Sequence, residues 1–171
     1  PEWMHPVLGI EAKPGRLARC SVRDESCRLL LNPLNAAAFA VDPRSGAVFV
    51  ADIDGNRLLK LAGDGTVLAI RALAMEAPAS LSLHEDTIYL TQGDSVIALD
   101  GGERNFGDEK ARHTLSVDGA QATGHIFPRA TTRLEEQWWV LMQSRDGSTS
   151  GLYRFNPDWQ YAGTAPLPDG A

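Results

Sequence analysis

The residues from 38 to 68 alternate between short apolar runs and turn-forming residues. Apolar runs of about five residues, bounded by Gly, Pro, Asn or Asp, are typical of β-strands joined by tight turns. The pattern predicts four strands in this segment, at residues 38–42, 47–51, 57–61 and 66–70. Four consecutive strands with short connections form an antiparallel meander.

Two weaker copies of this unit follow along the chain. Their predicted strands are residues 80–83, 87–91 and 95–99 in one copy, and 130–134, 137–142 and 152–155 in the other. The aromatic residues in the second strand of each unit, Phe49, Tyr89 and Trp139, are 40 and 50 residues apart. A single small sheet cannot bury both of its faces, and a period of about 40 to 50 residues is typical of propeller blades that stack on one another.

A partial copy of the unit lies near the amino end. Residues 15–20 align with the third strand of the first complete unit, and residues 27–31 align with the fourth. We therefore expect an all-β fold, an incomplete β-propeller of four-stranded antiparallel blades within a single domain, 1–171. The expected parts are a half blade at 15–31 and blades at approximately 36–70, 78–117 and 128–165.

Three and a half blades do not close a ring, and open blade edges invite further strands. The chain begins with Pro1, and no complete signal peptide or transmembrane stretch is present in it. We expect either a piece of a longer protein, with the missing part of its own propeller as partner, or a homo-oligomer formed through the open blade edges.

The charge of the chain disfavours one class of partner. Its 16 Lys and Arg against 22 Asp and Glu give a net charge of −6, which would repel nucleic acid. The basic residues that cluster are interpreted as a solvated strand edge, because two acidic residues interrupt them. They are Arg16, Arg19, Arg23 and Arg28, interrupted by Asp24 and Glu25.

The two cysteines, Cys20 and Cys27, fall on the two adjacent strands of the half blade. Opposed residues of an antiparallel pair approach to within reach of a disulfide. We predict this disulfide, and with it a periplasmic or extracellular location, because disulfides persist in oxidising compartments. Free thiols are the alternative, and the spacing does not match a zinc site.

The first complete unit resembles an NHL repeat. The resemblance rests on the run AFAVDP at residues 38–43, on VFVAD at 48–52, and on Asn56-Arg57-Leu58. It implies a propeller fold and does not select a function. In blades of this family the Asp and the Arg recur, which implies that Asp52 and Arg57 fasten the turn.

The loops at one end of the blades are the candidate binding face, because propellers present such loops to proteins and peptides. The polar candidates are Asp52, Asp54, Asn56, Arg57, Gln92, Gln143 and Arg145. Residues 52–56 also resemble the start of a calcium loop, but Gly63 stands where an EF-hand needs Glu. A surface calcium ion stays open, and we predict no other cofactor.

No catalytic residue is predicted. The run at 147–151 has Thr149 where a nucleophilic Ser would stand, and His5, His84, His113 and His125 lie on separate stretches. Adjacent Trp138 and Trp139 are interpreted as packing residues. We expect a non-catalytic interaction module of an exported protein, with a possible membrane anchor outside this chain.

The alternative is part of a metal-dependent lactonase of the gluconolactonase and regucalcin kind, which the chain resembles only in being a propeller. Such an enzyme holds one metal ion with converging Glu, Asn and Asp side chains. The candidates for that role are scattered along the sequence and match no motif of that family. They are Glu11, Asn32, Asn35, Glu76 and Asp118.

Overall fold

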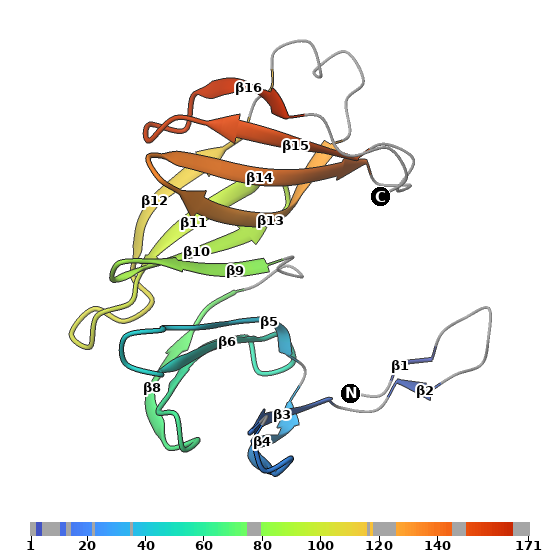
Figure 1. Cartoon of the computed structure of the whole chain (residues 1–171), viewed down its shortest axis with the longest axis vertical. Helices are drawn as coiled ribbons and strands as arrows, with labels where there is room; N and C mark the ends of the chain where they lie inside the picture. The colour runs from blue at the N-terminus through green and yellow to red at the C-terminus, as the bar shows by residue number, and fades with distance from the viewer. Residues whose placement is uncertain are drawn as a thin grey trace. The chain divides into compact units, whose positions relative to one another are not determined.

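The computed structural model describes residues 3–4, 11–12, 15–21, 23–34, 36–74, 80–115, 117, 126–144 and 150–165. The described residues are all β, and three antiparallel sheets have four strands each (Figure 1). This confirms the predicted fold class of four-stranded antiparallel blades. Nowhere in the described part of the chain does a helix have the length and hydropathy needed to cross a lipid bilayer.

Each four-stranded sheet pairs its strands in chain order. The first contains β5 (Ala36–Val41), β6 (Val48–Asp52), β7 (Arg57–Leu61) and β8 (Val67–Ala72). The second contains β9 (Ser80–His84), β10 (Thr87–Gln92), β11 (Ser95–Asp100) and β12 (Glu109–Thr114). The third contains β13 (Ile126–Leu134), β14 (Gln137–Ser144), β15 (Ser150–Phe155) and β16 (Tyr161–Ala165).

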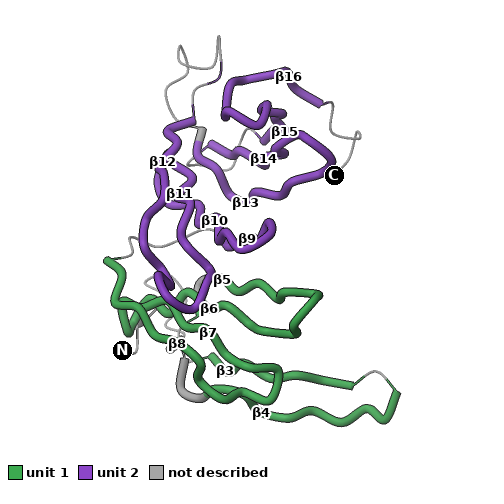
Figure 2. The backbone as a smooth tube through the Cα atoms, turned by 90° about the vertical axis from the view of Figure 1, so that its left-hand side faces the viewer, with its two compact units in different colours: residues 1–74 green, residues 75–171 purple. Residues whose placement is uncertain are grey.

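Two smaller sheets precede these blades. The strands β3 (Gly15–Cys20) and β4 (Cys27–Leu34) form an antiparallel hairpin at the predicted position of the half blade. The strands β1 (Trp3–Met4) and β2 (Glu11–Ala12) form another pair. The chain divides into two compact units, residues 1–74 and 75–171, shown in different colours in Figure 2.

Asp and Asn side chains close several turns between strands. After β5, Asp42 accepts a hydrogen bond from the Arg44 amide and another from the Ser45 hydroxyl. These two bonds lower the pKa of Asp42, the one from Ser45 having the larger effect. After β15, Asn156 accepts from the amides of Asp158 and Gln160. Short polar side chains that bond nearby backbone favour turns over continued strand, which is why the strands end there.

The core of the first unit lies on one face of the β5–β8 sheet. Val48 and Val50 on β6 and Leu59 and Leu61 on β7 are buried on this face. The half-blade hairpin covers them, because Leu17 on β3 and Leu30 and Leu31 on β4 pack against this cluster. The half blade therefore supplies the apolar cover that the central strands of the sheet require.

One core cluster of the second unit is rich in aromatic residues. Trp138, Val140 and Met142 on β14 alternate inward, as period-two strand geometry requires, and Tyr153 and Phe155 on β15 join them. Tyr89 on β10 packs against this cluster, which joins the two sheets of the unit. Trp139 faces the other way and is half-buried, with the Arg154 guanidinium 5.8 Å from the centre of its ring.

Candidate functional site

The predicted site residues Asp52 and Arg57 bind each other at the turn between β6 and β7. Arg57 Nε donates to Asp52 Oδ2 over 2.7 Å. The Asp52 side chain is 4% exposed and the Arg57 side chain is 39% exposed, so the ion pair reaches from the interior to the surface. A carboxylate bonded in this way supports the fastening role that the resemblance implies, and it is less available to a calcium ion.

The turn residues between Asp52 and Arg57 leave room for the ion pair. A Cβ at Gly55 would lie 2.6 Å from both Arg57 Nε and Asp52 Oδ2, so a side chain there would displace the pair. Asn56 has a φ of 46°, a left-handed conformation that Asn tolerates better than most residues. The amide of Asn56 donates to the Ile53 carbonyl, and its own carbonyl accepts from Leu73.

The other predicted loop residues lie on both units of the chain. Asp54 is exposed in the same turn. Gln92 ends β10, and its Oε1 is buried and has no hydrogen-bond partner among the residues that the structure describes. Gln143, on β14, donates through Nε2 to the Ser150 hydroxyl over 3.3 Å. Arg145 lies outside the described residues.

The candidate ligands of the lactonase alternative lie only partly within the described residues. Glu11 lies on β2 and Asn32 on β4, while Asn35, Glu76 and Asp118 lie outside the described residues. Among the residues that the structure describes, no group of three or more His, Cys, Asp or Glu side chains is placed to hold a metal ion.

The predicted disulfide is present and closes the tip of the half-blade hairpin. Cys20 and Cys27 are register partners on β3 and β4, with their Cα atoms 4.1 Å apart. Within the turn, Asp24 accepts from the Ser26 hydroxyl and amide. Its pKa is lowered by hydrogen bonds from the hydroxyls of Ser21, the larger effect, and of Ser26. The hairpin is therefore closed by both a covalent bond and a polar turn.

The hairpin docks on the turn between β7 and β8. Arg19 Nη1 donates to the Gly63 carbonyl oxygen over 3.1 Å. Gly65, with a φ of 92°, approaches the Leu30 backbone so closely that an added Cβ would lie 3.0 Å from the Leu30 carbonyl oxygen. Arg28 contributes to lowering the pKa of Asp64, although the hydrogen bonds from Thr66 have the larger effect. The interpretation of this basic cluster as a solvated strand edge is thus incomplete.

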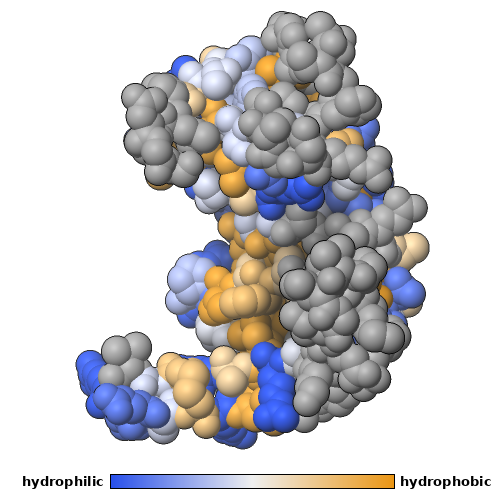
Figure 3. Space-filling view, turned by 90° about the vertical axis from the view of Figure 1, so that its right-hand side faces the viewer, coloured by the Kyte–Doolittle hydropathy of each residue, from blue (hydrophilic) through white to orange (hydrophobic). Residues whose placement is uncertain are grey.

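The hairpin covers only the middle of the sheet beneath it. The strand register places Phe39 and Val41 of β5 on the same face as Val50 and Val48. Phe39 is 56% exposed and Val41 is 50% exposed, whereas their partners on β6 are buried. Val67 and Ile70 on the opposite outer strand, β8, share this face and are also exposed. Figure 3 colours the apolar surface on one face of the molecule orange.

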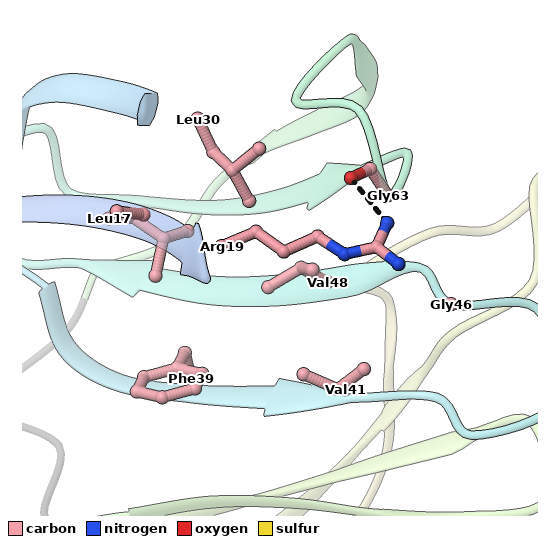
Figure 4. A pocket seen from close by; sticks show the side chains of 9 residues that line it. Leu17, Arg19, Leu30, Phe39, Val41, Gly46, Val48 and Gly63 are labelled. Carbon is pink, nitrogen blue, oxygen red and sulfur yellow. Dashed lines mark hydrogen bonds between the residues drawn. The ribbon is translucent and has the colours of Figure 1, made fainter. Parts of the chain in front are cut away.

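A cavity of about 230 Å³ opens between the hairpin and β5. Figure 4 shows that Leu17 and Leu30 line it from the hairpin, that Phe39, Val41 and Val48 line it from the sheet, and that the Arg19 side chain extends across it toward Gly63. Its lining is mostly apolar, with one guanidinium as the charged group. Concave apolar surfaces with few polar groups are typical of binding sites.

A stack of three rings in the second unit is not predicted from the sequence. The Trp159 ring lies between those of Trp138 and His113, with centroid distances of 4.5 and 5.0 Å and interplanar angles of 16° and 18°. Burial lowers the pKa of His113. Trp159 has a φ of 62°, which is rare for a bulky residue. The stack joins β12, β14 and the turn before β16, so its role in the fold is to hold two sheets together.

Solved structures share this fold. A hydrazine synthase structure from Kuenenia stuttgartiensis aligns with a TM-score of 0.65 and 9% identity, over 87% of this chain and 42% of that one. A nidogen/laminin complex aligns at 0.62 with 14% identity, over 95% of this chain and 57% of that one. A luciferin-regenerating enzyme aligns at 0.50 with 8% identity, over 73% and 43%. These neighbours are β-propeller proteins, and identities this low show the fold alone.

The chain spans about half the length of the first structures it matches, 42% of one and 57% of the other. No protein-family model matches it, and neither does any curated protein sequence. The similarity to known proteins is therefore one of architecture, and the chemistry of the chain has to be argued from its own residues.

Proposed function

We propose that this chain is a non-catalytic interaction module of an exported protein, and that it binds a protein or a peptide. The observation that carries the proposal is the apolar surface beside the half-blade hairpin, where Phe39 and Val41 are at least half exposed. Two large apolar side chains next to an apolar cavity favour association with another apolar surface.

The cavity is a better candidate than the loops because several loop residues already have partners. Asp52 is bonded to Arg57, and Gln143 is bonded to Ser150. Binding a partner through these groups would require breaking existing hydrogen bonds, whereas covering Phe39 and Val41 breaks none. Asp54, Asn56, Gln92 and Arg145 remain the alternative surface.

Export is proposed on the strength of the disulfide between Cys20 and Cys27. The bonded pair of Asp52 and Arg57 similarly supports an NHL type for the first blade. The ion pair closes the turn as a repeated fastening element would.

The test is selection of peptides from a displayed random library against the protein. We expect enriched peptides to bind the parent and to lose most of their affinity for a Phe39→Asp, Val41→Asp double variant. A loop variant, Asp54→Ala with Gln92→Ala, is the comparison and should retain them. Peptides that lose affinity only for the loop variant would show that the loops are the binding surface. No enrichment of peptides on the parent would refute the proposed function.

A further inference from the structure

One edge of β3 lies beside the exposed apolar side chains of Phe39 and Val41 on β5, which together form an apolar floor. In the described part of the chain, β3 pairs only with β4, so its other edge presents unpaired backbone amide and carbonyl groups. β3 runs close to β5, and Leu17 and Arg19 line the cavity together with Phe39 and Val41. An open strand edge and an apolar floor therefore meet at one corner of the first unit.

We propose that this corner binds an extended β-strand of a partner protein, which adds antiparallel to β3 and places alternate apolar side chains on Phe39 and Val41. The inference rests on the proposed function and names the chemistry of the partner. Strand addition satisfies the backbone groups of the edge, while the side chains that point down cover the apolar floor. Every strand pair in the described residues is antiparallel, which favours that direction.

The existing interface between the hairpin and the β5–β8 sheet indicates that a β-strand is the element that fits this corner. The hairpin covers Val48, Val50, Leu59 and Leu61 through side chains that project from a two-stranded sheet. The uncovered Phe39 and Val41 continue the same sheet face, one strand further along. A strand added to β3 would therefore cover them as β3 and β4 cover their neighbours. β3 has six residues, which sets the length of strand that can pair with it.

The positive charge of the hairpin also affects which strands bind most tightly. The hairpin carries four Arg against Asp24 and Glu25, in a chain whose net charge is −6. Arg19 uses one guanidinium N–H on Gly63, and a guanidinium has five N–H donors. A carboxylate on the incoming strand would find the remaining donors at the cavity, so we expect an apolar strand with one acidic residue to be preferred over its amide counterpart.

The probe is a labelled peptide of about eight residues that alternates Val and Thr and carries one Glu, matched to strand geometry. We expect binding to weaken about tenfold or more when Val41 is changed to Lys, which places a charge on the apolar floor. Ile70→Lys is the matched control, because Ile70 is 58% exposed on the same sheet face but lies on β8. Equal losses in the two variants would contradict docking at β5.

Two changes to the peptide test the strand geometry and the charge preference. Methylation of the peptide amides that face β3 should abolish binding, and the bound peptide should slow hydrogen exchange at β3. Replacing Glu by Gln should weaken binding to the parent but not to Arg19→Met. If library peptides need Phe39 yet leave exchange at β3 unchanged, the interaction function stands and the strand-addition inference fails.

The source of the strand is tested with the same probe. We expect the peptide to bind this chain both alone and within its full natural polypeptide. Binding to the isolated chain but not to the full polypeptide would mean that the same polypeptide supplies the strand, and it would overturn a partner in trans. Sedimentation that shows self-association, abolished by Val41→Lys, would assign it to a second copy and overturn the partner as well.

Discussion

Arg19 and Gly63 are 44 residues apart in sequence, and Arg19 Nη1 donates a hydrogen bond to the Gly63 carbonyl oxygen over 3.1 Å. The bond joins the half blade to the turn between β7 and β8 of the next sheet. It also holds the arginine side chain across the apolar cavity, where its aliphatic part lies among apolar residues while its charge stays near the surface.

Replacing Arg19 by Met should weaken this docking while keeping the apolar part of the side chain. We expect the free energy of unfolding of the first unit to fall by about 0.5–1.5 kcal/mol, the usual net value of one hydrogen bond. Urea unfolding measures it. Arg23→Met, an exposed change in the turn of the same hairpin, is the control, and equal effects of the two would show that the bond to Gly63 contributes nothing.

Reduction of the disulfide should destabilise the hairpin and the sheet that it covers. Cys20 and Cys27 are separated by seven positions, and closing a loop of that length restricts the unfolded chain by about 2.5 kcal/mol. We expect a thiol assay to find no free cysteine before reduction and a lower urea midpoint after it. The reductant should not affect a double variant, Cys20→Ser with Cys27→Ser. Free thiols in protein from the native compartment would remove the argument for export.

The blades could be predicted from the sequence because their signals are local. Asp42 directly follows β5 and Asn56 directly precedes β7, and the disulfide spans one short turn. The uncovered floor could not be predicted in this way. Phe39 and Val41 alternate along their strand as core residues do. They are exposed because the two strands of the hairpin do not reach over β5, and the sequence of β5 does not indicate this.

Contacts between distant segments were missed for the same reason. The sequence predicts Trp138 to be a packing residue, but its stack with Trp159 and His113 forms only when two sheets and a turn are in place. Trp159 follows β15 in a turn, where no periodic pattern indicates that it is directed inward. The contact of Arg19 with Gly63 likewise joins two blades, so no local pattern could indicate it.

The ion pair between Asp52 and Arg57 should contribute unequally through its two members. Arg57→Met leaves a carboxylate that is 4% exposed without its cation, whereas Asp52→Asn leaves an arginine that water can reach. We expect Arg57→Met to cost about 1–3 kcal/mol of unfolding free energy and Asp52→Asn to cost less. In a double-mutant cycle the double variant should lose less than the sum of the single losses. Additive losses would mean that the pair does not fasten the turn.

Removal of the Trp159 ring should separate the two sheets of the second unit. We expect Trp159→Ala to lower the free energy of unfolding by about 2–4 kcal/mol, below the value for a fully buried Trp because this ring is half-buried. The near-ultraviolet circular dichroism should weaken as Trp138 loses its stacked partner. Trp139→Ala is the matched control, since Trp139 lies on the other face of β14. Equal losses in both would contradict a special role for the stack.

His113 should make the second unit less stable in mild acid. Burial holds its pKa below the ordinary value of 6.5, so the folded protein takes up this proton less readily than the unfolded chain does. As the pH falls through about 6.5, protonation therefore favours the unfolded state, and the free energy of unfolding should decrease. His113→Phe keeps a ring against Trp159 but cannot take a proton, so its unfolding free energy should change less between about pH 7.5 and about pH 5.5. Chemical denaturation of both proteins over this range measures the difference in slope. Identical slopes would mean that His113 titrates alike in the folded and unfolded states and that its place in the stack does not affect its protonation.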